Sequence, residues 1–258
     1  IRVGAGGIML PNHSPLVIAE QFGTLESLYP GRIDLGLGRA PGSDQTTARA
    51  LRRNLASDSD EFPQDVLELM DYFAAEPKGP VRAVPGQGLD IPIWILGSSL
   101  YGAQLAAALG LPYAFASHFA PRYLMQAITL YRDEFQPSDK LAKPYVAIGV
   151  PLIVADTDEE AQYLASSVRQ RVLGILTGNR RRLLPPVENY MDGLHPRERD
   201  AIDDFLGLAV IGGPDTVRAG LLALKDATQV DEFLFVCDIF EPPARSHALE
   251  LVAAACLA

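Results

Sequence analysis

The chain has 258 residues, of which 48% are hydrophobic, and it carries a formal net charge of -10. This length and apolar content suffice for a large α/β domain, while the negative charge argues against nucleic acid as a partner. No apolar run approaches the ~20 residues that span a bilayer. The two cysteines, Cys237 and Cys256, fit neither a disulfide framework nor a zinc site, so we expect a cytoplasmic protein without a bound metal.

The first segments predict a strand, a helix and a second strand. Residues 1–10 already have a strand pattern, which indicates that the chain begins inside a fold. Residues 15–29 place apolar side chains at helical spacing, with Ser14 as the cap before them. A buried strand, Ile33–Gly38, follows and ends in a glycine-rich turn that carries Arg39, with Arg49 ten residues further on.

The turn after Ile33–Gly38 is suited to bind an anion. Its glycines let the backbone approach a ligand closely, and the guanidinium of Arg39 offers forked donors to a phosphate. Neither this turn nor the earlier Gly4-x-Gly6-Gly7 cluster has the spacing of a dinucleotide-binding fingerprint or a P-loop. The alternative is a tight turn with Arg39 in a surface ion pair.

A second phosphate signal follows the strand at residues 91–96. Helical patterns at 46–53 and 62–75 and a Pro/Gly-rich loop precede this strand. Ser98 and Ser99 then introduce a helix at 101–109, where free N–H groups and the helix dipole favour a phosphate. Together with the two arginines these serines would form one phosphate pocket, although simple N-capping explains the serines as well.

The rest of the chain continues the alternation of strands and helices. The expected strands lie at 113–116, 145–154 and 232–237, and the expected helices at 121–135, 158–176 and 244–255. Six strands that alternate with helices predict a parallel sheet with right-handed crossovers, either open and doubly wound or closed into a barrel. In both architectures ligands bind at the C-terminal ends of the strands.

Two of the four histidines follow strand ends. His13 and His118 are therefore candidates for proton transfer or ligand contact, although a hydrogen-bonded structural histidine fits equally well. His195 and His247 are expected at the surface. The sequence has no G-x-S-x-G nucleophile elbow and no H-E-x-x-H motif, so hydrolase functions lose support.

Taken together, the segments Val3–Pro11, Gly31–Arg39 and Leu96–Ser99, followed by Gly110-Leu111-Pro112, resemble the luciferase-like flavin-dependent monooxygenases. The resemblance spans nearly the whole chain in order. It implies a (β/α)8 TIM-type barrel, here as a single domain over residues 1–258 that comprises strands three to eight. The first two β/α units would be absent from this chain, either because the native protein is longer, which we favour, or because another chain covers the open edge.

The resemblance also implies a cofactor, reduced FMN, and the residues that hold it. Arg39 and Arg49 would bind the FMN phosphate together with the turn Ser98-Ser99. The pair Gly6-Gly7 matches a non-proline cis peptide behind the flavin ring. Gly102 stands where luciferase has a hydroxyl, so one phosphate contact is expected to be lost.

On the substrate side, Ser117 and His118 would line the flavin ring, and His118 and His13 are the candidate catalytic residues. Residues 177–199, which include the triple arginine 180–182, are expected to form a solvated loop or a lid. The expected reaction is oxidation of a small organic substrate by dioxygen, with a flavin reductase as the source of FMNH2 and a homodimer as the common assembly of relatives. The alternatives are an F420-dependent hydride-transfer enzyme and a non-catalytic flavin-binding protein.

Overall fold

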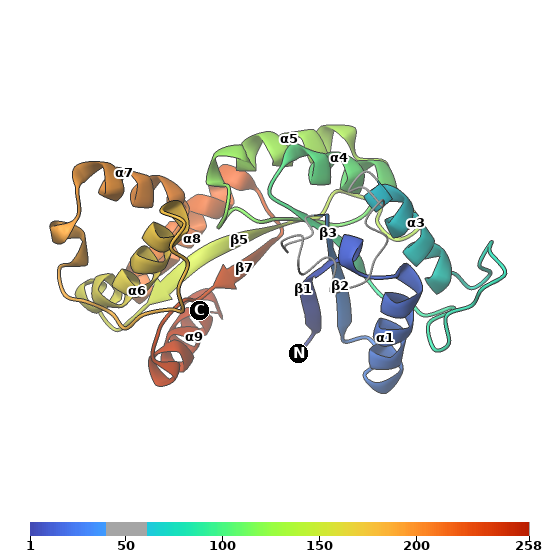
Figure 1. Cartoon of the computed structure of the whole chain (residues 1–258), viewed down its shortest axis with the longest axis horizontal. Coiled ribbons are helices and arrows are strands. Elements are labelled where there is room, and N and C mark those ends of the chain that lie inside the picture. The colour runs from blue at the N-terminus through green and yellow to red at the C-terminus, as the bar shows by residue number, and fades with distance from the viewer. Residues whose placement is uncertain (40–60, 258) are drawn as a thin grey trace. The chain divides into compact units, whose positions relative to one another are not determined.

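The computed structural model describes residues 1–39 and 61–257, which form an α/β fold whose described strand pairings are parallel. Contacts divide the chain into two compact units (Figure 1). The first comprises residues 1–114 and 127–145, and the second comprises residues 115–126 and 146–258. Arg49 and the helical pattern at 46–53 lie outside the described residues.

In the first unit the strands follow the order β1-β2-β3-β4 across the sheet. Their bounds are Val3–Met9 for β1, Ile33–Gly38 for β2, Ile93–Gly97 for β3 and Tyr113–Phe115 for β4, whose last residue belongs to the second unit. Its helices are α1 (Pro15–Leu28), α3 (Phe62–Phe73), α4 (Leu100–Leu109) and most of α5 (Leu124–Glu134), with a 3-10 turn at Leu10–Asn12. The first three residues of α5 and the 3-10 turn Pro121–Tyr123 belong to the second unit. In Figure 1, α1 runs beside β1 and β2, and α4 packs on β3.

The core of the first unit forms because the strands are apolar on the face that the helices cover. Leu35, Leu37 and Ile95 are fully buried, as are the helix residues Val66 and Leu69. In β2 the apolar side chains alternate with Asp34, Gly36 and Gly38, so one face of the strand is apolar. On the opposite face, β1 and β2 carry mainly glycine, so that face has few side chains.

The buried hydroxyl of Tyr131 connects α5 with both flanking segments of the first unit. It donates a hydrogen bond to the carbonyl oxygen of Leu111 at 2.8 Å and accepts one from the N–H of Tyr145 at 3.2 Å. We expect the substitution Tyr131→Phe to lower the free energy of unfolding by about 1–3 kcal/mol, because both bonds are lost inside the core. Urea denaturation measures the change. Tyr72→Phe, which removes only an exposed bond to Glu68, should stay within about 0.5 kcal/mol of wild type.

The second unit is built around β5 (Val146–Val154), all nine residues of which are buried. The first half of β5 pairs with β7 (Glu232–Val236), and its last three residues pair with β6 (Val210–Gly212). Helices α6 (Asp158–Leu176), α7 (Pro196–Phe205), α8 (Pro214–Thr228) and α9 (Pro242–Leu257) complete the unit, with a 3-10 turn at Tyr190–Gly193. In Figure 1, α6, α8 and α9 lie around these strands.

The predicted parallel α/β architecture is confirmed, and the predicted bounds of α6 agree with the structure at both ends. The expected count of six strands is wrong, because the described residues contain a seventh, β6. This three-residue strand was not predicted, because it is defined by its pairing with β5 and not by a local pattern. Closure into an eight-stranded barrel, the absence of two β/α units and a single domain over 1–258 remain predictions.

Candidate functional site

The N-terminus of α4 is the first part of the candidate site. The guanidinium carbon of Arg39 lies 4.1 Å from the centroid of the Tyr101 ring, in the first turn of this helix. Ser98 and Ser99 immediately precede the helix, and Ser99 is its N-cap in extended conformation. Among the described residues, the Ser99 side chain accepts no capping hydrogen bond. A cation, two hydroxyls and the positive end of a helix dipole therefore lie together, which is the composition of a phosphate site.

Buried contacts hold this turn in place. The hydroxyl of Tyr113 donates a hydrogen bond to the carbonyl oxygen of Ser99 at 3.2 Å. Burial raises the pKa of Tyr113 far above its ordinary value, so the phenol keeps its proton and remains a donor. Gly97 faces Gly102 at ordinary packing distance, since a Cβ on Gly97 would lie 3.6 Å from the Cα of Gly102. The expected loss of a phosphate contact at Gly102 stays a prediction.

The glycine face of β1 and β2 is the second part. The Gly6–Gly7 peptide bond is cis, as the resemblance implied. A Cβ on Gly36 would lie 2.3 Å from the carbonyl oxygen of Ala5, whereas a Cβ on Gly6 would meet no atom within 4 Å. The surface at Gly6 is therefore open, and a side chain there would fill space that a flat ring could occupy.

The histidine His13 ends the 3-10 turn that follows β1. Its backbone N–H donates to the carbonyl oxygen of Leu10 at 2.9 Å, and the residue is half-buried. The structure thus places His13 at the strand end where it was predicted. Its candidate catalytic role stays a prediction.

In the second unit, His118 is held against β5. The preceding residue, Ser117, is buried, and its hydroxyl donates to the carbonyl oxygen of Gly149 at 2.6 Å. The imidazole packs beside Phe119 with ring centroids 4.1 Å apart. Burial lowers the pKa of His118, the positive charge of Arg171 lowers it further, and the negative charge of Asp238 opposes both.

Sequence reasoning missed the residues around His118. Arg171 lies on α6 and Asp238 follows β7, and the two form an ion pair. Asp238 follows the end of an expected strand, and this position could have marked it as a candidate. Arg171 and Gly149 carry no comparable local signal, because only the tertiary fold brings them to His118.

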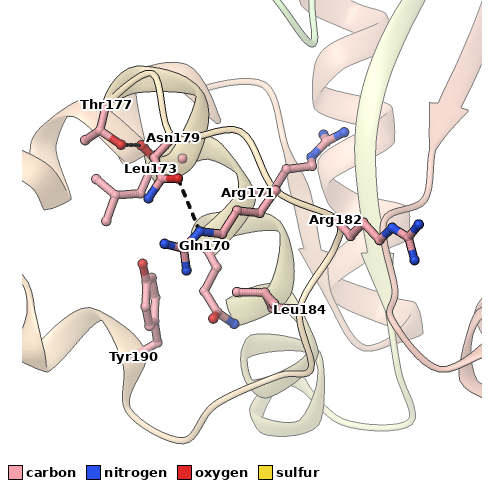
Figure 2. Close-up of a pocket in the computed structure, with 10 residues that line it drawn as sticks. Gln170, Arg171, Leu173, Thr177, Asn179, Arg182, Leu184 and Tyr190 are labelled. Atoms are coloured by element: carbon pink, nitrogen blue, oxygen red, sulfur yellow. Dashed lines mark hydrogen bonds between the residues drawn. The ribbon is translucent and has the colours of Figure 1, made fainter.

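The predicted lid, residues 177–199, is exposed over much of its length and contains the start of α7. Together with the end of α6 it lines an open pocket of about 190 Å³ (Figure 2). Figure 2 shows Tyr190 facing Thr177 and Asn179, with the side chain of Arg182 directed away from them. A second cavity of about 400 Å³ lies between β1 and α1. Neither cavity is lined by a predicted site residue, so the lid remains a prediction.

The described residues contain neither a membrane-spanning helix nor a metal-binding cluster. No helix in this part of the chain is long and apolar enough to cross a membrane. No group of three or more His, Cys, Asp or Glu side chains within it is arranged to hold a metal ion.

Comparison with known sequences gives a family match and curated relatives. The luciferase-like monooxygenase family matches residues 1–231. A luciferase-like monooxygenase of Escherichia coli (strain K12) is 52% identical over 252 residues, which cover 97% of this chain and 75% of that protein. N-acetyl-S-alkylcysteine monooxygenase of Bacillus subtilis (strain 168) is 28% identical over 274 residues, covering 100% and 78% of the two chains.

Solved structures with the same fold accompany these relatives. Apo-MsnO8 is similar with a TM-score of 0.85 and 32% identity, covering all of this chain and 78% of its own. The oxygenating constituent of 3,6-diketocamphane monooxygenase from Pseudomonas putida, solved in complex with FMN, has a TM-score of 0.71 at 18% identity, covering 98% and 78%. An F420-dependent tetrahydromethanopterin reductase from Methanopyrus kandleri has a TM-score of 0.67 at 16% identity, covering 98% and 81%.

Proposed function

The chain belongs to the luciferase-like monooxygenase family, and from this premise we propose that it is an FMN-dependent monooxygenase that oxidises a small organic substrate with dioxygen. Membership of the family supports an oxidoreductase of the monooxygenase type. The phosphate-binding composition at the N-terminus of α4 supports a phosphate-bearing cofactor, and we take FMN as the first candidate. The neighbour solved with FMN agrees with it.

The observation that carries the proposal is the position of Arg39. Its guanidinium stacks on Tyr101, beside Ser98 and Ser99, at a helix N-terminus. A phosphate bound there would accept hydrogen bonds from the arginine, from the serine hydroxyls and from backbone N–H groups. Arg49, which lies outside the described residues, is proposed as the second arginine of this pocket.

The open surface at Gly6 fits the flat part of the same cofactor. A planar ring system can lie over Gly6 because no side chain fills that space, and the Gly6–Gly7 peptide would form its support. When bound, FMN in its reduced form would supply the activation of oxygen. The protein would orient the ring and the substrate and exclude water, with His118 and His13 as the proposed catalytic side chains.

Cofactor choice is tested by anaerobic titration of the protein with reduced FMN and with reduced F420. Tight binding of FMN, followed by substrate-dependent oxygen uptake on exposure to air, is the expected result. Candidate substrates should include aldehydes, aromatic compounds and thioethers, the last because one relative is named N-acetyl-S-alkylcysteine monooxygenase. Binding of FMN without oxygen uptake would favour a non-catalytic flavin-binding protein.

The second candidate function is F420-dependent hydride transfer, which the similarity to the Methanopyrus kandleri reductase favours. F420 also carries phosphate, so the pocket at α4 does not separate the two cofactors. Tight binding of F420 with weak binding of FMN would select this function. A flavin reductase as electron donor, a cytoplasmic location and a homodimer remain parts of the proposal.

A further inference from the structure

The imidazole of His118 rests directly on the backbone of Gly149. A Cβ built on Gly149 would lie 2.3 Å from Nδ1, 2.9 Å from Cε1 and 3.5 Å from Cγ of His118. Because Nδ1 is the nearest ring atom and its two bonded neighbours are farther away, this position lies outside the ring beyond Nδ1. In glycine a Cα hydrogen occupies that direction, so a C–H group of Gly149 points at Nδ1.

This contact decides which ring nitrogen carries the proton. Nδ1 is buried and has no hydrogen-bond partner among the described residues. An N–H at Nδ1 would be crowded by the Gly149 hydrogen and would lose its bond to water, whereas a bare lone pair accepts a weak C–H contact. The neutral imidazole therefore carries its proton on Nε2, at the other edge of the ring. Nε2 is not among the buried unpartnered atoms.

Charges around His118 disfavour the doubly protonated ring. Arg171 reaches it from α6, and Asp238 reaches it from the segment after β7. The strand beneath, β5, has no ionisable side chain, and Glu232 lies at the far end of β7. Burial is the largest cause of the lowered pKa of His118, and the effect of Arg171 exceeds the opposing effect of Asp238, so the imidazole stays uncharged at neutral pH.

We propose that Gly149, Ser117 and the Arg171–Asp238 pair are positioning residues that hold His118 as the Nε2–H tautomer, which donates a hydrogen bond to a negatively charged oxygen at the reacting centre. The identity of the acceptor rests on the proposed function, because oxygen transfer develops negative charge on oxygen. The tautomer itself does not depend on that function. His118 is then a hydrogen-bond donor in catalysis. Its basic lone pair, on Nδ1, contacts Gly149 and is not available to accept a proton from the substrate.

Nitrogen-15 NMR of the histidine rings tests the tautomer in the flavin-free protein. The chain has four histidines, and His118→Gln identifies the signal of interest. We expect His118 to be protonated at Nε2 and bare at Nδ1 at pH 7.5, and to remain so until the pH falls below about 6.5, the ordinary histidine value. An Nδ1–H tautomer or an imidazolium at pH 7.5 would overturn the proposal, even if FMN binds. Failure to bind FMN would instead refute the function and leave the tautomer unaffected.

Substitution of Gly149 tests the contact between its backbone and the His118 ring. The methyl group of Gly149→Ala would overlap Nδ1, so the ring must move and its titration should shift toward the ordinary value of about 6.5. Gly193→Ala is the matched control, because a Cβ there meets no atom within 4 Å. An unchanged His118 spectrum in folded Gly149→Ala would contradict the contact between His118 and Gly149.

If Gly149→Ala does not fold, variants that remove one charge of the Arg171–Asp238 pair test the proposal instead. Arg171→Met leaves Asp238 alone and should raise the pKa of His118, while Asp238→Asn leaves Arg171 alone and should lower it further. A change in packing alone would not move the titration in opposite directions in the two variants. Shifts of the same sign, or none in either variant, would refute the role of the pair.

Discussion

Replacing Arg39 with alanine is expected to weaken FMN binding by about 10- to 100-fold. The reason is that a charge-assisted hydrogen bond to phosphate contributes roughly 1.5–3 kcal/mol, and no other cation is stacked on Tyr101 in the described structure. The dissociation constant is measured by titrating FMN with protein and monitoring the quenching of flavin fluorescence. The dissociation constant of Arg39→Lys for FMN should fall between those of wild type and Arg39→Ala. Lysine keeps the positive charge but lacks the forked donors and the planar group that stacks on the ring.

Riboflavin, which has no phosphate, makes this experiment specific. If Arg39 binds the phosphate, Arg39→Ala should weaken FMN binding and leave riboflavin binding nearly unchanged. Arg82→Ala is the matched control, since Arg82 is an exposed arginine of the same unit whose described bonds go to backbone carbonyls. If Arg39→Ala weakens the binding of FMN and of riboflavin equally, Arg39 supports the ring or the fold. If the binding of FMN is not weakened at all, the proposed phosphate pocket is refuted.

The contact of Arg39 with the first turn of α4 agrees with the sequence-based expectation because the signals on both segments are local. A strand end with glycines and an arginine, and two serines before a helix, are each visible within ten residues of sequence. The parallel fold then brings strand ends to one edge, and the contact of Arg39 with Tyr101 agrees with this expectation. The cis peptide at Gly6–Gly7, in contrast, was implied only by the resemblance, because no local pattern in the sequence predicts it.

The surroundings of His118 could not be predicted because they depend on contacts between distant segments. Gly149 interrupts an apolar strand with no sign that a histidine will rest on it, and Arg171 belongs to the polar pattern of α6. Asp238 meets Arg171 only after β7 has paired with β5. The strand β6 escaped prediction for a similar reason, since three residues form a strand there by pairing with β5 and packing on α6 and α8.

The second large effect is expected at His118, where glutamine and alanine should behave differently. His118→Ala should lower turnover by about 100-fold, because removal of a donor to a developing oxyanion costs roughly that much. The amide nitrogen of glutamine lies near the place of Nε2 and can donate a hydrogen bond, so His118→Gln should retain activity within about tenfold of wild type. Asparagine places its amide near Nδ1 instead, so His118→Asn should resemble alanine. The measurement is kcat for the first substrate that supports oxygen uptake with reduced FMN.

The dependence of kcat on pH separates a donor from a general base. Burial and Arg171 lower the pKa of His118, so wild-type turnover should be constant above about pH 6.5 and should fall only at lower pH. The fall is expected because a proton on Nδ1 is forced against Gly149 and displaces the ring. His118→Gln has no such proton, and its acid limb should disappear while activity remains. If His118 acts as a base, glutamine and alanine will be equally inactive, and the hydrogen-bond role will have to be abandoned.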